Sequence, residues 1–177
     1  MVSRNPKAQH ALVELKAKAT DLAGIRKKLT NLGAEQVGIF HQTDTYYLVP
    51  KGRLKLREVE GKAEAELIYY EREDTTSPKR SSVSILSIPN PQTLKRILGQ
   101  ILQVKAVVDK VREIYVHEGT QVHLDVVKGL GSFIEFERIT TQNAGQQEKD
   151  LARLERLRQQ MGISSESLER LSYSDLT

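Results

Sequence analysis

The 177-residue sequence contains no cysteine, which excludes a disulfide framework, a thiolate metal site and a cysteine nucleophile. Aromatic residues make up only 5% of the chain and no run of five Lys or Arg occurs, so neither base stacking nor a polybasic patch favours nucleic-acid binding. No apolar run approaches the roughly 20 residues of a membrane span, and the polar start of the chain lacks the apolar core of a signal peptide. We therefore expect a cytoplasmic protein that binds neither nucleic acid nor membranes.

The composition that is present suits one domain with a substantial core. Hydrophobic residues account for 38% of the chain, which is enough to fill the interior of a single domain of this length. The 27 basic and 23 acidic residues leave a net charge of +4. This mild basic excess on a mixed surface suits an anionic ligand.

One strand near the N-terminus has two faces of different character. In the segment 11–18, ALVELKAK, alternate side chains point to opposite sides of an extended chain. The alanines, the valine and the second leucine fall on one face, and Glu14, Lys16 and Lys18 fall on the other. Taken alone, this pattern is typical of an antiparallel strand with one solvated face.

The same alternation of apolar and charged residues recurs in four later segments. These segments are 53–57, 104–117, 121–127 and 132–139, and we expect each to be a strand. The charged residues that share a face within them are Lys55, Arg57, Lys110, Arg112, Asp125, Glu135 and Glu137.

The remaining elements are expected from periodicity, caps and turns. Helices with one apolar stripe are predicted from Thr20 or Asp21 to 32, from Asn90-Pro91 to 102 and over 146–161, with a short last helix from Ser164 or Ser165. Further strands are predicted over 34–41, 44–49, 65–70 and 82–88, and a loop over 74–80.

Two arrangements of these strands fit the pattern: a flat sheet with a wet charged face, or a sheet curled into an open barrel with the charges inside. The barrel is favoured, because helices would then cover its outer side. Grouped cations facing inward call for an anion between them, and grouped carboxylates call for a divalent cation. A polyphosphate with bound magnesium satisfies both demands. With no Cys and only four His, zinc is disfavoured.

Some residues keep two interpretations at this stage. His123 and Asp125 share a face, so they are either an acid–base pair or hydrogen-bonded neighbours. For four tyrosines, packing within the sheet is favoured over base stacking; they are Tyr46, Tyr47, Tyr69 and Tyr70. Loop solvation is favoured over ligand contact for Lys79 and Arg80.

The order and spacing of these motifs resemble the CYTH superfamily, which contains class IV adenylate cyclases, thiamine triphosphatases and other triphosphate tunnel enzymes. The resemblance covers nearly the whole chain, and the closing motif is similar to the class IV cyclase branch. The motifs that carry it are Val13-Glu14-Leu15-Lys16, Gln42-Thr43-Asp44-Thr45-Tyr46-Tyr47, Arg53-Leu54-Lys55-Leu56-Arg57, Leu67-Ile68-Tyr69-Tyr70-Glu71-Arg72, Lys110-Val111-Arg112, His123-Leu124-Asp125, Gly129-Leu130-Gly131-Ser132-Phe133-Ile134-Glu135-Phe136-Glu137 and Ser172-Tyr173-Ser174-Asp175-Leu176.

The resemblance implies an α+β fold, one CYTH-like domain over 1–177 in which an eight-stranded antiparallel barrel forms a triphosphate tunnel with flanking helices. It implies a Mg²⁺ or Mn²⁺ cofactor held by Glu14, Asp125, Glu135 and Glu137. It assigns catalytic roles to Glu14, Lys16 and Asp125, the last as a metal ligand or an orienting group. The phosphate-binding residues that it implies are Lys16, Lys18, Lys55, Arg57, Arg80, Lys110 and Arg112.

The sequence departs from the family pattern at one metal ligand. The first glutamate of the first-strand motif Glu-x-Glu-x-Lys would fall at position 12, which is Leu12. The resemblance implies a metal-dependent enzyme most like a class IV adenylate cyclase, which converts ATP to cyclic AMP and pyrophosphate. Leu12 keeps two alternatives open: a tripolyphosphate or thiamine triphosphate hydrolase, and a non-catalytic sensor of polyphosphates or nucleotides. The expected partner is a nucleoside triphosphate or another small triphosphate, and a homodimer is left open.

Overall fold

The computed structural model describes residues 7–72 and 79–177 of the chain. Its elements follow one another as β1 (Lys7–Lys18), α1 (Leu22–Asn31), β2 (Glu35–Tyr47), β3 (Arg53–Val59), β4 (Ala65–Arg72), β5 (Lys79–Ile88), α2 (Pro91–Ile101), β6 (Val104–His117), β7 (Thr120–Val127), β8 (Gly131–Thr140), α3 (Ala144–Gln160), the 3₁₀ helix η1 (Ser165–Ser167) and α4 (Tyr173–Leu176).

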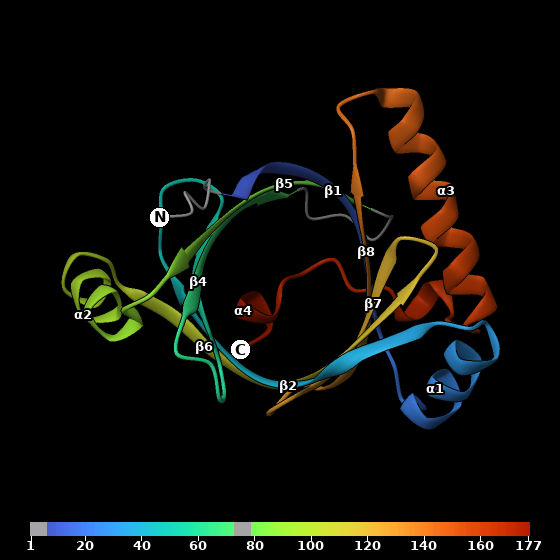
Figure 1. The fold of residues 1–177 in the computed structure, drawn as a ribbon, viewed down its shortest axis with the longest axis horizontal. Coiled ribbons are helices and arrows are strands. Elements are labelled where there is room, and N and C mark those ends of the chain that lie inside the picture. The colour runs from blue at the N-terminus through green and yellow to red at the C-terminus, as the bar shows by residue number, and fades with distance from the viewer. Residues whose placement is uncertain (1–6, 73–78) are drawn as a thin grey trace, which may run out of the picture.

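The strands form a closed antiparallel barrel in the order β1-β5-β4-β3-β2-β6-β7-β8, seen end-on as a ring in Figure 1. This confirms the predicted eight-stranded barrel and excludes the flat sheet. The ring closes at β1, which pairs with β5 on one side and with β8 on the other, so that Glu14 lies opposite Lys79 and Glu137. Closure leaves no strand edge, and it places one side chain of each alternating pair in the interior.

Two local predictions differ from the structure. The two short strands predicted over 34–41 and 44–49 are one strand, β2, because it pairs with β3 on one side and with β6 on the other without interruption at Gln42 and Thr43. Of the predicted loop over 74–80, residues 74–78 lie outside the described residues. Its last two residues, Lys79 and Arg80, already belong to β5.

Helices α1, α2 and α3 pack against the outside of the barrel (Figure 1). The apolar stripes of α1 and α3 meet the outward faces of β1, β7 and β8 in one core cluster that includes Leu15 and Leu154. The stripe of α2 meets β3 and β4 around Leu56. As predicted, Asn90 caps α2 with Pro91 in its first turn. No helix among the described residues is both long and apolar enough to cross a membrane.

The C-terminal segment takes a different course from the other helices. After η1, which is capped by Ser164, residue Leu168 forms a bridge to Ala17 of β1. The chain then enters the barrel and ends in α4, which Figure 1 shows inside the ring together with the C-terminus. The interior of the barrel is therefore shared between the charged side chains of the strands and the last residues of the chain.

Candidate active site

The barrel encloses a cavity of about 130 Å³ that is lined from all sides by inward-pointing side chains. Most of the charged residues expected from the sequence are brought together there, although they come from strands far apart in the chain. The lining residues are Leu12, Glu14, Lys16, Tyr46, Lys55, Arg57, Ile68, Tyr70, Arg72, Ser81, Val83, Ile85, Lys110, Arg112, Glu135, Glu137, Ser172 and Tyr173.

Asp44 lies at the centre of the cationic part of the tunnel. Its carboxylate accepts two hydrogen bonds from Arg57 (2.7 and 2.8 Å), one from Lys55 Nζ (3.0 Å) and one from Lys110 Nζ (2.8 Å). Burial alone would raise the pKa of Asp44, but its three cationic partners outweigh that effect and hold the pKa well below its ordinary value. Asp44 therefore remains a carboxylate, and one negative charge holds three basic side chains in place.

The basic side chains of this cluster exceed the negative charge that Asp44 supplies. Burial is the main reason that the pKa of Lys55 is lowered to about 7; the charge of Arg57 adds to the lowering, and Asp44 opposes it. Burial is also the main reason that the pKa of Lys110 is lowered. The cluster is thus short of negative charge, and an anion that entered it would be attracted to these residues.

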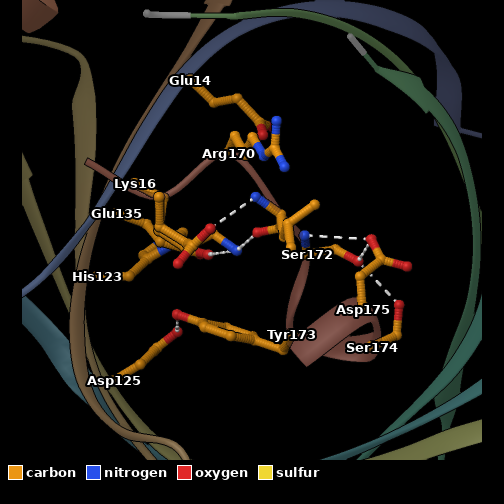
Figure 2. Close-up of polar contacts among 12 residues, drawn as sticks. Glu14, Lys16, His123, Asp125, Glu135, Arg170, Ser172, Tyr173, Ser174 and Asp175 are labelled. Carbon is orange, nitrogen blue, oxygen red and sulfur yellow. Dashed lines mark hydrogen bonds and ion pairs between the residues drawn. The ribbon is translucent and has the colours of Figure 1, made fainter. Parts of the chain in front are cut away.

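A second cluster joins β6, β7 and β8. Arg112 forms a bidentate pair with Asp125, with Nε 2.7 Å from Oδ1, and also donates to Glu135. Asp125 accepts a further hydrogen bond from the hydroxyl of Tyr173 at 2.8 Å (Figure 2). Burial would raise the pKa of Asp125, but Arg112 lowers it below its ordinary value. Both oxygens of Asp125 are engaged, which suits an orienting group better than a metal ligand.

The first-strand carboxylate is also paired. Glu14 accepts a hydrogen bond from Arg72 Nη1 at 2.6 Å. Burial raises the pKa of Glu14, and the Arg72 charge opposes that rise. Leu12, one step along β1 on the same face, packs against an apolar cluster of the tunnel wall that includes Val83. The position of the missing glutamate has therefore become part of an apolar wall.

His123, Glu135 and Glu137 form a group of three possible metal ligands whose donor atoms lie within 4.8 Å of one another. His123 is only 3% exposed, and its Nε2 lies 3.1 Å from the amide oxygen of Gln121. Its buried Nδ1 has no hydrogen-bond partner among the described residues, although Glu135 and Glu137 lie 3.7 and 3.8 Å away.

The C-terminal segment supplies its own polar groups to the tunnel. Lys16 Nζ donates to the backbone carbonyl of Leu171 at 2.6 Å, and Lys79 Nζ donates to those of the two preceding residues. Asp175 accepts hydrogen bonds from Arg53 at 3.0 Å and from Lys105. We call this segment, residues 168–177, the tail. It thus presents oxygen atoms to the basic side chains of the tunnel.

The ring of Tyr173 extends this contact between the tail and the tunnel wall. It lies between two tunnel lysines, 4.2 Å from Lys16 Nζ and 5.5 Å from Lys110 Nζ. An aromatic face attracts cations at such distances. The ring and the Leu171 carbonyl therefore lie against Lys16 and Lys110, two of the basic residues that were expected to bind phosphate.

Two of the expected phosphate-binding residues do not line the cavity. Lys18 is exposed at the end of β1. Arg80 is exposed on the outer face of β5, because it lies opposite Val13, whose side chain belongs to the outer core. Its neighbour Lys79 is buried and contacts the tail inside the barrel. The basic residue that β5 contributes to the interior is therefore Lys79, which corrects the assignment of Arg80 and the expectation that Lys79 is solvated in a loop.

Sequence reasoning also missed Asp44, Arg72 and the insertion of Tyr173. Arg72 had a detectable signal, since it follows Tyr70 at strand spacing and so shares its face. Asp44 had a weaker one, as a lone carboxylate in a run of strand-forming residues. Nothing in the pattern of the last residues indicates where they dock.

A larger cavity of about 640 Å³ lies on the outside of the barrel, between the turn after β3 and the start of α2. Its acidic residues are already paired: Glu58 with Lys95, Glu60 with His41 and Glu64 with Ser87. The tunnel, with buried groups of both signs facing one cavity, remains the better candidate for chemistry.

Known proteins are similar to this chain in sequence or in fold. A Methanocaldococcus jannaschii protein, MJ0240, named as a candidate adenylate cyclase, is 26% identical over 175 residues, covering 93% of this chain and 97% of that protein. The Pyrococcus horikoshii protein PH1012 superposes with a TM-score of 0.82 at 23% identity, covering 93% of this chain and 98% of that one. HpAC1 from Hippeastrum, a candidate adenylyl cyclase with a dominant triphosphatase activity, superposes with a TM-score of 0.64 at 16% identity, covering 94% and 93%.

The family assignment rests on the sequence as well as on the fold. The CYTH domain profile matches residues 11–173, a range that runs from the first strand of the barrel to the first residue of α4. The chain belongs to the CYTH domain family.

Proposed function

We propose that this protein binds a triphosphate in the tunnel together with a divalent metal ion and, like a class IV adenylate cyclase, converts ATP to cyclic AMP and pyrophosphate. The observation that carries the proposal is the convergence of opposite charges on one cavity inside the barrel. Lys55, Arg57 and Lys110 face it from one side, and Glu135 and Glu137 face it from the other. A polyphosphate with its metal is complementary to both sides.

The basic residues would hold the phosphate chain. Phosphoryl oxygens accept charge-assisted hydrogen bonds from guanidinium and ammonium groups, as the oxygens of Asp44 do in the structure. Arg57 and Lys110 are fixed in position by Asp44, so little ordering is needed when an anion arrives. We assign the same role to Lys16 and Lys79, which now donate to tail carbonyls.

The carboxylate side has donors that fit a divalent metal. Glu135 and Glu137 lie on one face of β8, and the orphaned Nδ1 of His123 is aimed toward them. Glu14 lies next to Glu137 in register and would join them if Arg72 turned to a phosphate. When bound, such a metal neutralises charge on phosphoryl oxygens and polarises the phosphorus.

In the proposed cyclisation the ribose 3′ oxygen gives its proton to a water molecule and attacks the α-phosphorus, and the bond from the α-phosphorus to the departing pyrophosphate breaks. Negative charge then accumulates on the pyrophosphate oxygens. The buried cations stabilise that charge in a site of low dielectric, where each donor matters more than it would in water. Asp125 acts through Arg112, which it orients by the bidentate pair.

Hydrolysis of inorganic tripolyphosphate is the second candidate, and the size of the cavity favours it. The free volume of about 130 Å³ is well below the roughly 300 Å³ at which sites for drug-sized ligands begin. A bare phosphate chain is more compact than a nucleotide. With the tail in place, the tunnel therefore suits a compact polyanion, and a nucleoside requires the tail to move.

The experiment is incubation of the purified protein with ATP, thiamine triphosphate or tripolyphosphate, each with Mg²⁺ or Mn²⁺, resolving cyclic AMP, pyrophosphate and orthophosphate separately. Cyclic AMP with an equal amount of pyrophosphate is the expected result. Orthophosphate without a cyclic product would establish the hydrolase instead. Lys110→Met should lower the rate by about 10²-fold or more, while Arg80→Met, on the outer face of β5, should leave it unchanged.

A non-catalytic sensor would give a third outcome: triphosphate would raise the melting temperature with no turnover of any substrate. The variant Leu12→Glu distinguishes an enzyme with weakened metal binding from a tunnel that has lost catalysis. A weakened enzyme should gain rate and metal affinity from the restored carboxylate, whereas a tunnel wall adapted to another use should gain neither.

A further inference from the structure

His123 is buried beside two carboxylates, and one of its ring nitrogens has no hydrogen-bond partner among the described residues. The amide oxygen of Gln121 can only accept a hydrogen bond, so the His123 Nε2 atom, 3.1 Å away, must donate to it. In the neutral ring the proton is then on Nε2, and Nδ1 carries a lone pair. This lone pair is buried without a hydrogen-bond partner among the described residues.

The groups that face this lone pair are carboxylates. Glu135 lies directly opposite His123 in the β7–β8 ladder, and Glu137 lies opposite Gln121. Their oxygens are 3.7 and 3.8 Å from Nδ1, too far for a hydrogen bond. Glu135 is also held by Arg112 on the oxygen that faces Nδ1, but neither carboxylate gives Nδ1 a hydrogen-bond partner, and a cation bound between the three groups would give it a partner.

We propose that His123 Nδ1, Glu135 and Glu137 form a mixed nitrogen–oxygen site for a divalent transition metal such as Mn²⁺, in preference to Mg²⁺. Imidazole nitrogen is a good ligand for transition metals, whereas Mg²⁺ prefers oxygen ligands alone. The Nε2–Gln121 hydrogen bond fixes the ring and leaves Nδ1 for the metal, as partners of metal-binding histidines commonly do. Leu12 itself supplies no carboxylate, so the imidazole completes the set.

The proposal refines the proposed function, because it names the metal-binding residues of the same tunnel, yet it does not depend on turnover. The sequence-based expectation was a site of four carboxylates. Asp125 is held by Arg112 and Tyr173, and Glu14 is held by Arg72. The nitrogen ligand takes the place of these groups and changes the metal preference.

The test measures metal binding in the absence of triphosphate. Mn²⁺ is titrated into the purified protein and the free ion is followed by electron paramagnetic resonance; Mg²⁺ is then added as a competitor. The wild type should bind Mn²⁺ at least about tenfold more tightly than Mg²⁺. His123→Gln should lose about tenfold or more in Mn²⁺ affinity, since even partners outside the ligand set contribute about 10–100-fold, and should change Mg²⁺ affinity by much less.

The matched control is His41→Gln. His41 also lies between two carboxylates, Glu60 at 2.9 Å and Asp109, but on the exposed outside of the barrel, and its loss should leave Mn²⁺ affinity unchanged. Glu137→Gln should weaken Mn²⁺ and Mg²⁺ alike. Circular dichroism of each variant verifies that the barrel is folded.

A second measurement keeps the proposal testable if His123→Gln does not fold. Nitrogen-15 spectra of the histidine rings should show an Nε2–H tautomer for His123 in the metal-free protein and selective broadening of its Nδ1 signal by Mn²⁺. A doubly protonated ring that Mn²⁺ leaves unbroadened, or an His123→Gln variant that binds Mn²⁺ as tightly as the wild type, overturns the proposal. Neither result bears on whether the tunnel binds triphosphate, which tripolyphosphate reports through its own shift in melting temperature.

Discussion

Replacing Asp44 by asparagine tests the charge balance of the tunnel most directly. The change keeps the shape of the side chain and removes the negative charge that holds Lys55, Arg57 and Lys110. Because Asp44, Lys55 and Lys110 are buried and the Arg57 side chain is only 14% exposed, three basic side chains would face one another without a counter-charge. Removing one partner of a buried ion pair costs about 3–5 kcal/mol.

The expected loss of stability can be measured as a decrease in the melting temperature. For a chain of this length each kcal/mol shifts the melting temperature by about 2–4 °C, so Asp44→Asn should lower it by roughly 6–20 °C. The matched control is Asp109→Asn. Asp109 lies next to Asp44 across the β2–β6 ladder but points outward, with 38% of its side chain exposed, so its loss should change stability by about 1 kcal/mol or less.

Tripolyphosphate should reverse the destabilisation, because its oxygens replace the lost carboxylate. At a ligand concentration of 100 times Kd, binding adds about 2.7 kcal/mol to the stability of any binding-competent form. Asp44→Asn should also bind the anion more tightly than the wild type, so its melting temperature should rise by more. Equal melting temperatures for Asp44→Asn and Asp109→Asn, or weaker anion binding by Asp44→Asn, would refute this account of the tunnel.

Two further predictions concern pH and the tail. The pKa of Lys55 is about 7, against about 10.4 in the unfolded chain; the ligand-free fold should therefore gain stability from this residue as pH rises from about 7 to 10. A bound polyanion favours the protonated amine of Lys55, so triphosphate binding at pH 8 should take up a proton and should weaken as pH rises. Calorimetry in two buffers of different ionisation enthalpy measures this uptake, and finding none would contradict the prediction. Asp175→Asn removes the carboxylate that binds Arg53 and Lys105, so the tail should be cleaved faster by trypsin and triphosphate should bind several-fold more tightly; unchanged cleavage would mean that other contacts hold the tail.

The barrel could be anticipated from the sequence because its signal is local. In β3 and β8 each side chain alternates between an apolar and a charged environment, and that alternation needs no knowledge of the partner strand. The position of a residue within an alternating run decides whether it faces inward. Where the run itself was misjudged, at the start of β5, the inward residue was assigned to Arg80 in place of Lys79.

The pairing of the charges could not be predicted in the same way. Asp44 meets Lys110 only because β2 and β6 are neighbours in the ring, although they are separated by three other strands along the chain. The same holds for Glu14 and Arg72, which meet because β1 and β4 lie on either side of β5 in the ring. Tyr173 reaches Asp125 because the tail turns into the barrel, a path set by tertiary contacts that no periodicity encodes.

Closure of the barrel by its first and last strands determines how the chain must fold. β1, the first strand of the barrel, pairs with both β5 and β8. Its pairing is therefore complete only after the later strands have formed, and such long-range pairing slows folding. Until then the edges of β5 and β8 are open and able to pair with other molecules. The tail follows β8 in the chain, so its docking site inside the ring is complete only when β1 has paired with both neighbours. We therefore expect refolding to be slow and to depend on protein concentration, because the barrel closes through strands that are distant in the sequence.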